Sequence, residues 1–129
     1  MSGGGGKKRI LIVEDNHDAG ISLQMLLTAL GHEVHLVADG ETAVRDCPGY
    51  RPDLILMDLG LPGISGYEAA QQIRAAHPPH PLTIAACTGW GYDSDRQLSI
   101  AAGIDHHFVK PLDFATLTSL LDAPAEAPR

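Results

Sequence analysis

The feature that most constrains the fold of this chain is a regular alternation of short apolar runs with longer amphipathic segments. We predict strands at residues 10–13, 33–37, 53–58, 82–87 and 107–109. Four of these runs are apolar along most of their length, which is typical of parallel strands covered on both faces. The alternation therefore favours a parallel sheet over an antiparallel one.

A segment with helical periodicity follows each apolar run. We predict helices at residues 18–31, 40–47, 66–77, 94–103 and 113–123. The first pattern stops at Gly31, a residue that commonly ends helices. Because parallel strands need crossover connections that return to the sheet, five β-α units predict a doubly wound α/β fold with helices on both faces.

The length of 129 residues predicts one domain with a core of its own. We expect a flexible leader or cloning remnant at residues 1–7, the domain at 8–122, and a disordered tail or linker start at 123–129. The opening "MSGGGG" lacks the apolar region of a secretory signal. No apolar run approaches the roughly 18 residues needed to span a bilayer, so we expect a cytoplasmic protein that does not enter the membrane.

Charge and cysteine content exclude several further classes. A net charge of -7 opposes direct binding to nucleic acid or to anionic membranes. Cys47 and Cys87 are 40 positions apart and form no CxxC motif, so their spacing supports neither zinc nor a redox pair. We predict that both cysteines are reduced.

Polar residues follow the predicted strands at the edge where ligands bind in open α/β sheets. They are Glu14 and Asp15 after the first strand, Asp58 as the last residue of the third, Thr88 after the fourth, and Lys110 with Pro111 after the fifth. Any one of them alone is more often a helix cap or a solvated charge. Together they predict a functional site.

The chemistry of this site follows from its charges. Three carboxylates at one edge repel each other unless a cation lies between them. Oxygen ligands without His or Cys favour Mg2+, which keeps several waters for a phosphate. Thr88 and Lys110 suit phosphoryl oxygens. Asp58 can then attack phosphorus to form an acyl phosphate, with catalysis by positioning and charge neutralisation.

The segments "LIVEDN", "DLILMDLGLPGISGYE", "CTG" and "HFVKPLD" resemble the response-regulator receiver domain of two-component signalling. The resemblance covers nearly all of residues 8–122. It implies a flavodoxin-like sheet with strand order 2-1-3-4-5 and five helices. It also implies a conformational switch, not a metabolic enzyme, that catalyses only its own phosphorylation and dephosphorylation. A sensor histidine kinase or a histidine phosphotransfer domain would phosphorylate Asp58.

The resemblance assigns roles to the strand-end residues. Asp15, Asp58 and the Gly60 carbonyl would bind Mg2+ directly, and Glu14 would bind it through water. Thr88 and Lys110 would hold the phosphoryl oxygens.

The same resemblance implies that Thr88 moves on phosphorylation. The signal would reach a possible homodimer or partner face formed by the fourth helix, the fifth strand and the fifth helix.

Two positions depart from the family pattern. The family often has an aromatic switch residue three positions before the lysine, and this chain has His107 there, beside His106. Neighbouring strand residues point to opposite faces, which argues against a zinc site at this pair. Trp90 lies two positions after Thr88, where its ring could shield the phosphoryl group or instead contact a partner.

Other classes fit less well. An aspartate-nucleophile phosphohydrolase would need an acid two residues after Asp58, where this chain has Gly60. A dinucleotide-binding domain would need glycines after the first strand, where "EDNHDAG" places acids. A phospho-independent interaction module of the same fold is the remaining alternative. The segments around Trp90 and Lys110 resemble receivers fused to sensor kinases, which favours a domain of a larger protein over a free-standing one.

Overall fold

A computed structural model describes residues 7–61, 63–76, 81–88, 100–109 and 113–122. These residues form one five-stranded sheet in the order β2-β1-β3-β4-β5. The strands are β1 (Arg9–Val13), β2 (Glu33–Val37), β3 (Leu54–Asp58), β4 (Thr83–Thr88) and β5 (His106–Val109). Every neighbouring pair is parallel, so the predicted flavodoxin-like order is confirmed.

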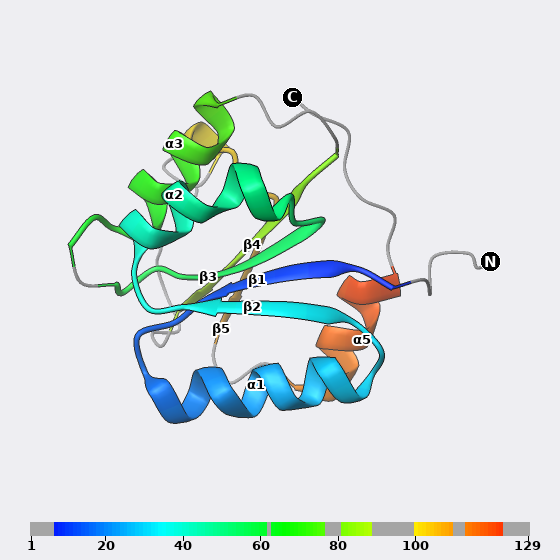
Figure 1. Ribbon diagram of the computed structural model, residues 1–129. Helices are drawn as coiled ribbons and strands as arrows, with labels where there is room; N and C mark the ends of the chain where they lie inside the picture. The colour runs from blue at the N-terminus through cyan, green and yellow to red at the C-terminus, as the bar shows by residue number, and fades with distance from the viewer. Residues whose placement is uncertain (1–6, 62, 77–80, 89–99, 110–112, 123–129) are drawn as a thin grey trace.

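Helices cover both faces of the sheet. Their bounds are α1 (His17–Ala29), α2 (Gly40–Tyr50), α3 (Gly66–Ala75) and α5 (Phe114–Asp122). Residues 100–102 are also helical and belong to the segment predicted as the fourth helix. Figure 1 shows α1 and α5 on one face and α2 and α3 on the other, as a doubly wound sheet requires. Within the described residues, no helix has the length and apolar character needed to span a membrane.

Two apolar cores lie on either side of the sheet. Leu11 and Val13 of β1 belong to the core beneath α2 and α3, whereas Ile10 and Ile12 belong to the core beneath α1 and α5. All four side chains are at most 1% exposed. This two-sided burial explains why the strands are continuous apolar runs without polar alternation.

The helix predicted at residues 40–47 continues past Pro48 to Tyr50. A proline inside a helix removes one backbone hydrogen bond, so the sequence pattern favours an earlier end. Contacts with the sheet hold the last turn, because the Tyr50 ring lies 4.4 Å from the guanidinium carbon of Arg9. Arg51 then ends the helix in the left-handed conformation, with φ of 57°, and its amide donates to the Cys47 carbonyl at 2.8 Å.

Candidate functional site

Asp58 lies at the carboxyl end of the central strand. It is the last residue of β3, aligned with Cys87 of β4, and only 8% of it is exposed. The next amide, that of Leu59, donates to the Cys87 carbonyl at 3.0 Å and keeps the chain against the sheet as it leaves the strand. A carboxylate is thus held at the sheet edge among otherwise apolar strand residues.

Glu14 and Asp15 occupy the turn between β1 and α1. The Glu14 amide donates to the Val37 carbonyl of β2 at 3.0 Å, which extends the parallel pairing beyond the strand end. Asn16 begins α1, since its side chain accepts a hydrogen bond from the Ala19 amide at 3.0 Å. The turn is therefore fixed on both sides of Asp15.

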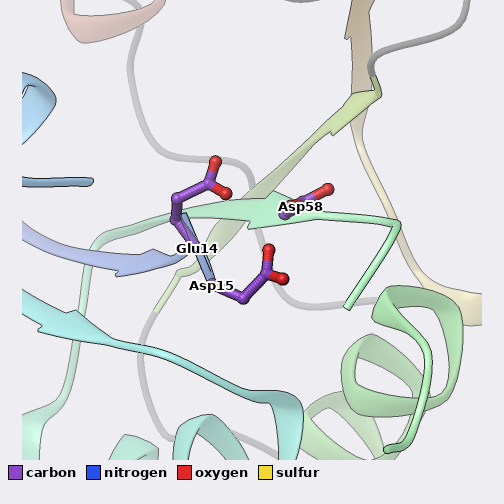
Figure 2. A group of neighbouring side chains, drawn as sticks. All are labelled: Glu14, Asp15 and Asp58. Atoms are coloured by element: carbon purple, nitrogen blue, oxygen red, sulfur yellow. The ribbon is translucent and has the colours of Figure 1, made fainter. Parts of the chain in front are cut away.

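The three carboxylates gather at one place, as the sequence predicts. One carboxylate oxygen from each of Glu14, Asp15 and Asp58 lies within 4.8 Å of the others. Figure 2 shows that two come from the end of β1 and one from the end of β3. An all-oxygen donor set of this size and charge suits a hard divalent cation such as Mg2+. The residues therefore fit the predicted magnesium site.

The described residues of the loop after β3, 59–61 and 63–65, contact Asp58 and lead into α3. The Gly60 amide donates to Asp58 Oδ1 at 2.9 Å. The loop ends at Ser65, whose side chain accepts from the Glu68 amide at 3.1 Å and caps α3. Gly66 then approaches Asp58 so closely that a Cβ there would lie 2.7 Å from the Asp58 carbonyl oxygen. This contact requires glycine. The role of the Gly60 carbonyl as a magnesium ligand stays a prediction.

The residues that the sequence predicts to hold or flank the phosphoryl group are only partly described by the structure. Thr88 is the last residue of β4, next to Val109 in the sheet, but its side chain is not described. Trp90, Lys110 and Pro111 lie outside the described residues. The roles of these four residues stay predictions.

His107 lies in β5 and is aligned with Ala86 of β4. Its Nε2 atom is buried, and no hydrogen-bond partner for it occurs in the part of the chain that the structure describes. His106 instead stacks on Phe108, with ring centroids 5.9 Å apart. The two histidines therefore have different surroundings, as expected for neighbours on a strand.

Sequence analysis did not identify two residues that shape this site. Asn16 follows the acidic pair and could have been recognised as a helix cap from its position. Glu41, in the first turn of α2, accepts a hydrogen bond from the Ile64 amide of the loop at 3.2 Å. Glu41 and Ile64 are 23 positions apart, so no local sequence pattern predicts their contact.

Comparison with known proteins agrees with this geometry. The family model described as "Response regulator receiver domain" matches residues 10–122. The two-component response regulator PhoP of Pseudomonas aeruginosa is 35% identical over 116 residues, which cover 89% of this chain and 50% of PhoP. The chain thus spans about half the length of this curated relative.

Two solved structures are also similar. The receiver domain of the sensor histidine kinase PA1611 from Pseudomonas aeruginosa has magnesium coordinated in its active-site cleft. It is 38% identical, with a TM-score of 0.80, and the match covers 90% of this chain and 95% of that one. The second is the receiver domain of Ssk1 from Saccharomyces cerevisiae, in complex with the histidine phosphotransfer protein Ypd1. It is 30% identical, with a TM-score of 0.80 and coverage of 89% and 86%.

Proposed function

Because the chain belongs to the response regulator receiver domain family, we propose that it accepts a phosphoryl group on Asp58 and acts as a phosphorylation-dependent switch. The observation that carries this proposal is the buried carboxylate of Asp58 at a strand end, with Glu14 and Asp15 within 4.8 Å. A buried aspartate beside two further carboxylates is costly without a cation. A site for a cation and for a reaction at Asp58 accounts for this arrangement of carboxylates.

The metal would be Mg2+, held by Asp15, Asp58 and the Gly60 carbonyl, with Glu14 acting through water. When bound, it would neutralise the charge of the carboxylates and of the incoming phosphoryl group. The Gly60 amide, 2.9 Å from Asp58 Oδ1, orients the carboxylate for attack. Such orientation is the main contribution a protein makes to phosphoryl transfer.

The reaction is a displacement at phosphorus. A carboxylate oxygen of Asp58 forms a bond to phosphorus as the phosphorus–nitrogen bond of a phosphohistidine breaks, and the imidazole leaves with the electron pair. The product is an acyl phosphate on Asp58 and a free histidine on the donor. Thr88 and Lys110 would hold the phosphoryl oxygens through a hydroxyl and an ammonium group.

The donor would be a sensor histidine kinase or a histidine phosphotransfer domain. Support comes from the Ssk1 receiver, which was solved in complex with the phosphotransfer protein Ypd1. We propose that transfer takes place in the cytoplasm and that the chain catalyses only its own phosphorylation and dephosphorylation. We also propose the fourth helix, β5 and α5 as the face through which the activated chain would form a homodimer, without direct contact with nucleic acid.

Labelling with a small-molecule phosphodonor tests the acceptor. With acetyl phosphate and Mg2+, mass spectrometry should show one added phosphoryl group in the parent and in Asp18→Asn, and none in Asp58→Asn. Asp18 is a matched control because it is an exposed aspartate in the first turn of α1. EDTA should abolish labelling of the parent. A phosphoryl group that persists in Asp58→Asn would refute the assignment. Failure of the folded parent to accept phosphate would favour the phospho-independent interaction module.

A further inference from the structure

Glu41 connects α2 to the loop that follows β3. Its Oε2 atom accepts a hydrogen bond from the Ile64 amide at 3.2 Å, although Glu41 belongs to the neighbouring β-α unit. Ile64 lies two residues before α3, and its partly buried side chain packs on the core beneath α2 and α3. The carboxylate thus holds the loop at a point between the core and α3.

Two glycines allow this close approach. Gly63 has a φ of +75°, and a Cβ there would lie 2.6 Å from Glu41 Oε2 and 2.9 Å from Oε1. On α2 itself, a Cβ at Gly40 would lie 2.8 Å from the Ile64 side chain. A side chain at either glycine would have to displace the loop or the carboxylate. The loop and the first turn of α2 are therefore fitted to each other.

The same loop carries the groups that act on Asp58. Gly60 donates its amide to Asp58 Oδ1 at 2.9 Å, and the proposed function assigns its carbonyl to magnesium. At the other end, Ser65 caps α3. A shift of the loop would move the Gly60 amide and carbonyl together, and small shifts of such groups weaken the catalysis they support. The contact between Glu41 and Ile64 is thus a third restraint on the position of Gly60, besides the end of β3 and the start of α3.

The alternative role for Glu41 is an interaction of its charge with the dipole of α2. A carboxylate in the first turn of a helix interacts favourably with the helix dipole whether or not it touches a loop. Glu68 provides the comparison, since it is also an exposed acid in a first turn, that of α3. Glu68 donates its backbone amide to the Ser65 hydroxyl at 3.1 Å. The two residues share their charge and helix position, but of these two side chains only that of Glu41 bonds to the described residues of the loop.

We propose that Glu41 is a positioning residue for the chemistry at Asp58. It holds the loop through the Ile64 amide so that Gly60 stays in place beside the carboxylate, and it thereby raises the affinity of the site for Mg2+. This inference rests on the proposed function for the identity of the metal. The role needs an oxygen acceptor at position 41 and not its charge.

The test compares Glu41→Ala, Glu41→Gln and the control Glu68→Ala with the parent. Mg2+ affinity is measured by calorimetry, and exchange of the Ile64 and Gly60 amides is measured by NMR in the metal-free proteins. Loss of one hydrogen bond should weaken Mg2+ binding by about 3- to 10-fold in Glu41→Ala and speed both exchange rates. Glu41→Gln keeps a carbonyl oxygen and should stay within about twofold of the parent, as should Glu68→Ala.

Labelling by acetyl phosphate separates positioning from a loss of stability. In Glu41→Ala, labelling should slow at limiting Mg2+ and recover at saturating Mg2+, with a thermal midpoint close to that of the parent. Unchanged Mg2+ affinity and Gly60 exchange in Glu41→Ala would overturn the inference, as would equal losses in all three variants. If the parent binds Mg2+ but takes up no phosphoryl group, the proposed function fails, while a weakened Mg2+ affinity in Glu41→Ala would still support positioning by Glu41.

Discussion

Arg74 of α3 and Asp105, the residue before β5, form an ion pair with 2.6 Å between Nη2 and Oδ2. The two side chains are only 15% and 2% exposed. Each makes a second bond, since Arg74 Nε donates to the Gly103 carbonyl at 2.9 Å and Asp105 accepts from the Ile84 amide at 2.9 Å. The pair therefore fixes the start of β5 against α3 and β4, three residues before the end of the strand that leads to Lys110.

Removal of one partner should be costly because the other charge would stay buried. We expect Arg74→Ala to lower the free energy of unfolding by about 3 kcal/mol, measured by urea denaturation. Arg45→Ala is the control, because Arg45 pairs with Asp46 at 3.0 Å but is 73% exposed. That change should cost less than about 1 kcal/mol. Similar losses in both variants would contradict a special role for the buried pair.

The Cys47 thiol should be unreactive at neutral pH. Burial raises its pKa to about 11, and the positive charge of Arg74 opposes this rise only in part. Since the thiolate is the reacting form, we expect alkylation by iodoacetamide at pH 8 to be more than about 100-fold slower than for an exposed thiol. Peptide mass spectrometry of native and urea-unfolded protein would measure this difference. Equal modification of Cys47 in both states would refute the prediction.

The strands could be predicted because burial on both faces of the sheet makes most of them continuous apolar runs in the sequence. Residues 33–37 coincide with β2, the predictions for β1, β3 and β5 differ from the observed bounds by one residue at one end, and that for β4 differs by one residue at both ends. The end of α1 was also predictable, since Gly31 adopts a φ of +98° after the helix. The last turn of α2 could not be predicted from the sequence. Tyr50 is held by a strand far away in the sequence, and this contact outweighs the local effect of Pro48.

The acid side of the site was predictable for a different reason. Glu14 and Asp15 follow β1, and Asp58 ends β3, its neighbour in the parallel sheet, so topology alone brings the three together. The contact between Glu41 and Ile64 depends on how α2 lies beside the loop, which no spacing rule reports. The same holds for Arg74 and Asp105, which are 31 positions apart.

Asp46 should make stability depend on pH in the acid range. Its pKa is lowered first by the hydrogen bond from His35, with 3.0 Å between Nε2 and Oδ2, and then by that from Arg45. The folded pKa lies below the unfolded value of 3.8, so the contribution is complete above that value and is lost as pH falls through the folded pKa.

Denaturation of the parent and Asp46→Asn between pH 2 and 6 would test this contribution. The parent should lose more stability than the variant as the pH falls below 4. Asp18→Asn serves as a control at an exposed aspartate in the first turn of α1 and should follow the parent. Parallel curves for the parent and Asp46→Asn would contradict the prediction.

The buried Nε2 of His107 should cost stability. An unsatisfied buried polar atom is penalised by about 1–3 kcal/mol, and a phenyl ring has no such atom. We expect His107→Phe to raise the free energy of unfolding by about 1 kcal/mol. His106→Phe is the matched control, since His106 stacks on Phe108 and, within the described residues, has no buried nitrogen without a hydrogen-bond partner. A loss of stability in His107→Phe alone would indicate that the ring nitrogen has a favourable role after all.

His107 should also transmit phosphorylation to the surface. The sequence predicts it as a switch residue, and its alignment with β4 brings it beside Ala86, two residues before Thr88. Movement of Thr88 toward a phosphoryl group would change the space that the ring at 107 can enter. Because an imidazole is smaller than a phenol, we expect weaker coupling between the phosphorylation site and the surface than an aromatic residue would give.

NMR spectra with and without beryllofluoride, a phosphoryl mimic, should therefore show larger shifts of β5 and α5 amides in His107→Phe than in the parent. Equal shifts would mean that His107 only fills space and that the signal travels through the segment after β4.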